Sequence, residues 1–252
     1  MKKTSWQKVS KWYSGITKGS GHYFHEHVVN PKVLKLLGLN PQSSVLDLGC
    51  GTGAFARALP KGIPYTGIDI AKSMIDEAKK YDKDPKHTYA IADVTRSIGA
   101  PKTFTHATFI LSLQNIKEQK EAIRVASEHL VPNGVLVIVL NHPSFRIPRQ
   151  SSWQIDETNK LEYRRINRYL SPLEVPVNMH PSERSSAVTW SYHVPISAYS
   201  EYLKANGFVI EALEEWTSDK ESAGKKAKME NRARSEFPLF LAIKAKKLTP
   251  QM

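Results

Sequence analysis

Short apolar runs and amphipathic stretches alternate along most of the chain. The apolar runs are rich in Val, Ile, Leu, Thr and Tyr and predict strands; they occupy residues 45–48, 65–70, 89–93, 107–113, 135–140, 208–213 and 239–245. Patterns of helical period fall between them, at residues 31–38, 71–81, 118–130 and 196–206. Strands that alternate with helices at this spacing predict an α/β fold with a doubly wound, mostly parallel sheet of about seven strands.

The first predicted strand ends in a glycine-rich turn. Gly49, Gly51 and Gly53 follow the apolar residues 45–48, and a helical pattern resumes at residues 54–59. Glycine adopts backbone angles, and allows close approaches, that a side chain would block. A turn of this kind before a helix presents free N–H groups to a ligand, so the segment predicts a nucleotide-binding loop.

The spacing of this loop distinguishes between classes of nucleotide. The dinucleotide fingerprint is G-x-G-x-x-G, whereas here the last spacing is one residue shorter and Asp47 precedes Gly49 by two residues. A carboxylate at the loop favours a ligand with a cationic amino group or a sulfonium over a pyrophosphate. The D-x-G-x-G-x-G pattern resembles the first motif of class I S-adenosylmethionine (SAM) methyltransferases, and residues 129–139 are similar to the turn and strand after their fourth crossover helix.

This resemblance implies a Rossmann-like fold, SAM as the cofactor, and a role for each acid that ends a predicted strand. Asp47 would hold the amino group of the methionine part, Asp69 the ribose hydroxyls and Asp93 the adenine amino group. The alternative for Asp69 and Asp93 is that they cap the segments that follow. The complete set expected to bind the cofactor is Asp47, Gly49, Cys50, Gly51, Gly53, Asp69, Ile70, Asp93, Val94 and Leu111.

Two segments fall outside the generic pattern. Residues 1–30 are aromatic and basic, and we interpret them as an arm or lid that precedes a helix beginning at Asn30-Pro31. Residues 142–195 are rich in proline and too long for an ordinary connection, which predicts an inserted substrate lid. The SAM-binding core is then expected at residues 31–141 and 196–247.

The expected catalytic residues are His142, which follows the fifth strand, and Tyr23 in the arm. A histidine titrates near neutral pH and suits a general base, although a capping or packing role for His142 is the alternative. His22, Arg146 and Arg149 are the residues we expect to bind the acceptor, since arginine binds carboxylates and phosphates. The histidines of the arm have no nearby cysteine pair, so no metal is expected.

The charge of the chain leaves a second class of acceptor open. The net charge is +12, and residues 1–36 hold seven lysines against one acid, Glu26. Such an arm either attracts RNA, with tRNA first, or is a solubilising surface. The basic N-terminus has no apolar core typical of a signal peptide, no apolar run approaches the length of a membrane span, and Cys50 is the only cysteine. These features favour a cytoplasmic protein that does not enter the membrane.

The sequence thus predicts a SAM-dependent methyltransferase that acts on an oxygen or nitrogen of a small-molecule acceptor. An RNA methyltransferase that uses the basic arm is the first alternative. A SAM- or nucleotide-binding module without catalytic activity is the second. The oligomeric state is not predicted.

Overall fold

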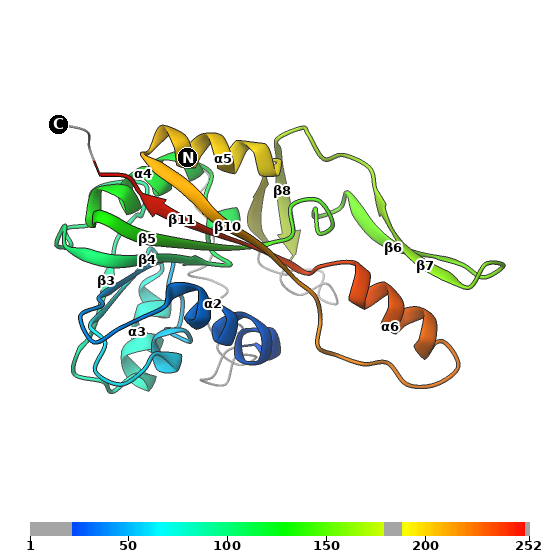
Figure 1. Ribbon diagram of the computed structural model, residues 1–252, viewed down its shortest axis with the longest axis horizontal. Helices are drawn as coiled ribbons and strands as arrows, with labels where there is room; N and C mark the ends of the chain where they lie inside the picture. Colours follow the sequence, from blue (N-terminus) through cyan, green and yellow to red (C-terminus); the bar gives the residue numbers. More distant parts are fainter. Residues whose placement is uncertain (1–21, 179–187, 250–252) are drawn as a thin grey trace.

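A computed structural model of the chain describes residues 22–178 and 188–249. Its centre is a seven-stranded sheet with the strand order β10-β11-β5-β4-β1-β2-β3 (Figure 1). These strands are β1 (Val45–Leu48), β2 (Tyr65–Asp69), β3 (His87–Ile91), β4 (Phe104–Ile110), β5 (Leu130–Asn141), β10 (Phe208–Trp216) and β11 (Phe240–Lys247).

The five strands from β3 to β5 run parallel, and β11 is antiparallel to both β5 and β10. The sequence order reverses between β1 and β4, so the sheet has a switch point beside β1. Ligands of open α/β sheets bind at the carboxyl ends of the strands at such a point. The predicted fold class is confirmed.

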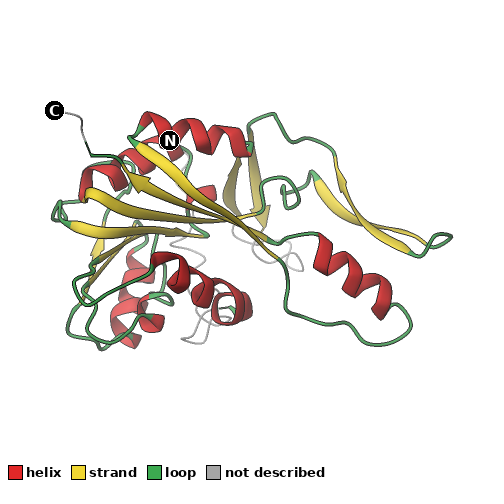
Figure 2. Ribbon diagram, viewed as in Figure 1, coloured by secondary structure: helices red, strands yellow, loops and turns green. Residues whose placement is uncertain are grey.

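Helices cover both faces of the sheet (Figure 2). One apolar cluster joins the sheet to α4 (Gln119–His129) and α5 (Ile196–Ala205), and the other joins it to α2 (Asn30–Leu37) and α3 (Lys72–Tyr81). The central strand β1 is buried along its whole length, with the pattern expected of a parallel strand covered on both faces. The burial of these two clusters fixes the strand ends that form the site.

Three local predictions are wrong in detail. The helix expected at residues 54–59 is only a 3₁₀ turn, Ala56–Ala58, after a series of turns. The helix expected to start at Asn30-Pro31 instead continues from a π-helical turn, His25–Val29, in which the N–H of Asn30 donates to the carbonyl of His25. That wider turn accommodates the proline, which has no N–H to donate.

The turn expected before the strand within residues 129–139 lies inside β5. Leu130 pairs with Phe104, and Val135 pairs with His106. Residues 131–134 of β5 therefore lie opposite a single residue of β4. Asn133 has φ 61°, the left-handed conformation that a turn residue adopts. The turn therefore forms as an irregularity in the strand rather than before it.

The insertion consists of two separate hairpins. The first pairs β6 (Ser151–Asp156) with β7 (Leu161–Ile166), and it projects from the core beside α6 (Ala227–Glu236) (Figure 1). The second pairs β8 (Leu173–Asn178) with β9 (Val188–His193). The two hairpins lie at different places on the core, so they need not share one function.

Candidate functional site

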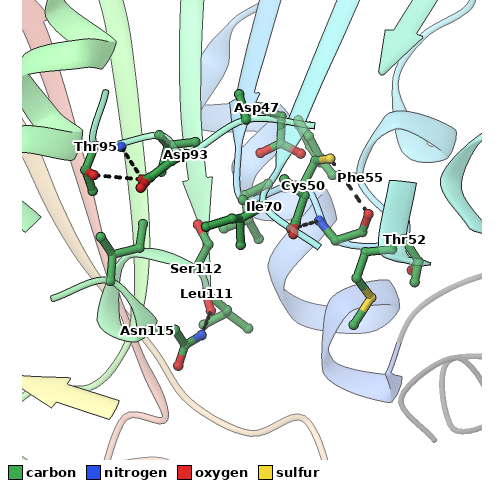
Figure 3. Close-up of a pocket in the computed structure, with 18 of the residues that line it drawn as sticks. Asp47, Cys50, Thr52, Phe55, Ile70, Asp93, Thr95, Leu111, Ser112 and Asn115 are labelled. Carbon is green, nitrogen blue, oxygen red and sulfur yellow. Dashed lines mark hydrogen bonds between the residues drawn. The ribbon is translucent and has the colours of Figure 1, made fainter. Parts of the chain in front are cut away.

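A cavity of about 760 Å³ opens at the carboxyl ends of β1, β2, β3 and β4. Its walls include residues 49–52 of the glycine turn, the three acids predicted from the sequence and two residues of the β8–β9 hairpin, Glu174 and Tyr192 (Figure 3 shows the core side). Gly53, also expected at the cofactor, does not line the cavity and instead lies against Tyr89. The volume lies within the range of roughly 300–1,000 Å³ that is usual for small-molecule sites. The structure therefore brings the predicted strand-end residues to one pocket.

Asp47 lies at the floor of this pocket with both carboxylate oxygens hydrogen-bonded. Tyr65 donates to one oxygen and Thr108 to the other, each at 2.8 Å. Burial raises the pKa of Asp47 to about 6, although the two hydrogen bonds partly oppose the shift. A cationic group placed beside this carboxylate would favour its ionised form.

Asp69 connects the end of β2 to the glycine turn. Its Oδ2 accepts a 2.9 Å hydrogen bond from the N–H of Gly51, and its Oδ1 accepts one of 2.8 Å from the N–H of Ala71. Burial raises the pKa of Asp69, and the backbone donors partly oppose this. The carboxylate still lines the cavity, so it can meet a ligand while it holds the turn.

Asp93, which follows β3, and Leu111, which follows β4, also line the cavity (Figure 3). Asp93 accepts hydrogen bonds from the backbone and the hydroxyl of Thr95, at 3.0 and 2.7 Å, which is the capping geometry given above as an alternative. Leu111 has φ 54°, an uncommon conformation for a branched residue. Its carbonyl accepts from the side chains of Gln114 and Asn115, at 3.1 and 3.2 Å, and these two bonds hold the strained turn.

Glycine is needed at positions 49 and 51 of the turn for different reasons. A Cβ at Gly49 would lie 2.5 Å from Cβ of Ser112, which leaves no room for it. A Cβ at Gly51 would meet no atom within 4 Å, and this residue lines the cavity. The space above Gly51 is thus a cradle for a ligand, and with the carboxylates of Asp47 and Asp69 it fits the cationic and hydroxyl groups of SAM.

The β8–β9 hairpin is attached across the mouth of the pocket. Lys117 pairs with Glu174 at 2.5 Å, and the side chain of Gln119 donates to the carbonyl of Tyr192 at 2.9 Å. These contacts link the hairpin to the start of α4, close to the end of β4. Only the second half of residues 142–195 therefore borders the pocket.

His25 is a pocket residue that sequence reasoning missed. Burial, and to a lesser extent the charge of His22, lowers the pKa of His25 to about 4, so its ring is neutral at pH 7. Its Nδ1 is buried and has no hydrogen-bond partner among the residues the structure describes. The sequence suggested a role for His25 only as a metal ligand beside His22 and His27, and His22 alone was expected to bind the acceptor. Within the described ranges no cluster of three metal-binding side chains occurs.

The two residues predicted to be catalytic do not line the pocket. His142 is buried, its Nε2 is 2.7 Å from Oε1 of Glu215, and its Nδ1 accepts the N–H of Ser144 at 3.1 Å. This geometry favours the capping alternative. Tyr23 is exposed, donates to Asp219 at 3.0 Å and stacks on His27.

The predicted substrate residues are also elsewhere. His22 is exposed and does not line the pocket. Arg146 and Arg149 line a second cavity, beside the β6–β7 hairpin. The lysines of the basic arm up to Lys18 lie outside the described residues, as do the tryptophans Trp6 and Trp12.

Comparison with known proteins gives the class of the chain. A family described as "Methyltransferase domain" matches residues 22–213, and the chain belongs to this family. The match confirms the predicted enzyme class and the resemblance to class I SAM-dependent methyltransferases.

Individual relatives agree with this class. A SAM-dependent methyltransferase from Mesorhizobium loti superposes with a TM-score of 0.67 at 24% identity, covering 86% of this chain and 96% of that one. A putative SAM-dependent methyltransferase from Listeria monocytogenes gives a TM-score of 0.66 at 26% identity, covering 87% and 98%. Demethylmenaquinone methyltransferase from Staphylococcus aureus is 26% identical over 137 residues, which are 52% of this chain and 56% of that protein. The match thus spans little more than half the length of that curated relative.

Among the described residues, every helix is too short or too polar to cross a bilayer.

Proposed function

We propose that the protein transfers a methyl group from SAM to an oxygen or nitrogen of a small-molecule acceptor bound under the β8–β9 hairpin. The observation that carries the proposal is that one cavity extends from Gly51 in the glycine turn to Glu174 and Tyr192 in the hairpin. A donor and an acceptor can therefore share one cavity. The Staphylococcus aureus relative, whose name gives demethylmenaquinone as its acceptor, also favours a small molecule.

The residues of the core account for donor binding. Asp47 would hold the amino group, Asp69 the ribose hydroxyls, and Asp93 with Ile70 and Val94 the adenine. SAM supplies an electrophilic methyl group on a sulfonium, and transfer is an in-line displacement for which alignment provides most of the acceleration. The backbone of Leu111, held by Asn115, would form the wall against the transferred methyl.

His25 is the base that we assign to the acceptor. The ring is neutral at pH 7 because burial lowers its pKa, so one ring nitrogen can accept a proton. An acceptor O–H or N–H becomes more acidic as the new bond to carbon forms, and His25 would take that proton.

The test is uptake of labelled methyl from SAM into separated pools of cellular small molecules and bulk RNA. Label in a small molecule, reduced with the Asp69→Ala variant at limiting SAM, supports the proposal. Label in RNA, with binding that weakens steeply with salt and is lost on Lys→Gln changes in the basic arm, would support the RNA alternative instead. SAM binding without label in either pool would favour a non-catalytic binding module.

A further inference from the structure

A second cavity of about 380 Å³ lies where the insertion leaves the sheet. The segment after β5, the β6–β7 hairpin and the segment before β11 form its walls. It shares no lining residue with the methyl-transfer pocket among the described parts of the chain. Nothing in the donor or acceptor chemistry uses it.

Two arginines from different segments line this cavity. Arg146 donates through Nη1 to the side-chain oxygen of Asn141 at 2.9 Å. Arg164 of β7 donates through Nε to the carbonyl of Phe145 at 3.0 Å and through Nη2 to the hydroxyl of Ser151 at 2.8 Å. All these acceptors are neutral, so they fix the position of each guanidinium but do not balance its positive charge. Each guanidinium also keeps N–H donors that can bind a ligand.

These two arginines have no acidic partner in the described ranges 22–178 and 188–249. No ion pair includes Arg146 or Arg164. Burial lowers the pKa of both groups, and the positive charge of Arg164 lowers the pKa of Arg146 further. Partly buried like charges of this kind are costly in free energy unless an anion balances them. The exposed Arg149 adds a third positive charge at the rim.

The rest of the wall is aromatic. Phe237 makes edge contacts with Phe145 and Trp153, with ring centroids 5.4 and 5.5 Å apart, and Arg164 stacks over Trp153 at 4.8 Å. Trp153 is 37% exposed, so part of its ring is available to a ligand. The cavity therefore offers planar cations in contact with flat aromatic surface.

We propose that this Arg146–Arg164 cavity binds an oxyanion, phosphate or carboxylate, carried by an aromatic body. Guanidinium groups bind both oxyanions through paired N–H donors, and the aromatic rings would pack against the attached body. The proposal does not depend on which acceptor is methylated. Its ligand is distinct from the methyl donor, since the cavity lies apart from the glycine turn.

The test measures binding of inorganic phosphate, phenyl phosphate and benzoate to the full-length protein by calorimetry, with chloride at the same ionic strength as the reference. We expect saturable binding of phenyl phosphate or benzoate, with phenyl phosphate tighter than inorganic phosphate. Arg146→Gln and Arg164→Gln should each weaken this binding roughly tenfold or more, because a charge-assisted hydrogen bond is lost. Arg168→Gln, on the same basic insertion but exposed, is the matched control and should change nothing.

SAM affinity, measured in parallel, should be the same in all four proteins and verifies that each variant is folded. If Arg164→Gln fails to fold, Arg164→Lys keeps the charge but not the planar donor pair, and should still weaken binding. Equal affinities in the wild type and the arginine variants, or no binding above the chloride reference, would overturn the proposal. Phenyl phosphate that binds no more tightly than inorganic phosphate would overturn its aromatic part.

Discussion

The hydroxyl of Tyr65 donates a hydrogen bond of 2.8 Å to the carboxylate of Asp47, 18 residues away in the sequence. The bond joins neighbouring parallel strands, β1 and β2, under the glycine turn. It stabilises the charged form of a carboxyl group whose burial favours the neutral form. The pKa of Asp47 therefore depends on burial, which raises it, and on hydrogen bonds, which lower it, so a single substitution can shift it.

The first prediction concerns the pH dependence of SAM binding. The amino group of SAM is best bound by ionised Asp47, whose pKa is about 6. Affinity should therefore fall as the pH drops below about 6, approaching tenfold per pH unit. Tyr65→Phe removes a bond that lowers the pKa, so the fall should begin at a higher pH; calorimetry across the pH range measures it. Tyr81→Phe, on an exposed ring, is the control, and an unchanged profile in Tyr65→Phe would remove Asp47 from this role.

The second prediction concerns Asp69. Asp69→Ala should weaken SAM binding by about 1–3 kcal/mol, because the ribose hydroxyls lose their acceptor and the N–H of Gly51 loses its partner. Asp69→Asn keeps one oxygen acceptor and should lose less. Asp76→Ala, which removes an exposed surface pair with Lys72, should leave the affinity as it is. Full SAM affinity in a folded Asp69→Ala protein would contradict the ribose assignment.

The third prediction separates the two glycines that begin the turn. Gly49→Ala should mainly lower the melting temperature, because its methyl group would overlap Ser112. Gly51→Ala should cost only about 1 kcal/mol in folding, the strain of a left-handed alanine, but should weaken SAM binding strongly. Thermal unfolding and calorimetry on both variants measure the difference. A Gly51→Ala protein that binds SAM normally would show that the cradle is not the cofactor site.

The fourth prediction concerns His25 as the base. His25→Gln should lower kcat by roughly a hundredfold or more, the usual contribution of a general base, with a smaller effect on the KM for SAM. His27→Gln removes an exposed neighbour and is the control. At saturating SAM, kcat of the wild type should stay constant down to about pH 5 and fall near pH 4, since the pKa of His25 is about 4. A loss of activity near pH 6.5 would point to a different base.

The core could be predicted from the sequence because its signals are local. A buried strand, a glycine turn and an acid at the strand end are encoded within a few residues, as at Asp47 and Gly49. The strand order was not predicted, because the connection from β3 to β4 crosses β2 and β1. The sequence around Asn133 indicates a turn. It does not indicate that β5 pairs with β4 on both sides of this turn, because β4 lies about 30 residues earlier in the chain.

The rest of the site depends on contacts that sequence spacing does not reveal. His25 lies at the start of a π-helical turn and lines the same cavity as the glycine turn, about 25 residues later in the chain. Arg164 meets Arg146 only because β7 pairs with β6. His142 was expected at the site because it follows a strand end, yet Glu215 on β10 holds it apart. Such long-range contacts decide between a catalytic histidine and a structural one.

Cys50, the single cysteine of the chain, also has an experimental use. Its thiol is buried under the glycine turn, close to Gly67, and burial keeps its pKa well above the usual value. A thiol in this state reacts slowly with alkylating reagents, and opening of the turn should make the reaction faster. The alkylation rate of the unaltered protein therefore measures how often the cofactor site opens. This rate should fall when a bound ligand holds the turn closed.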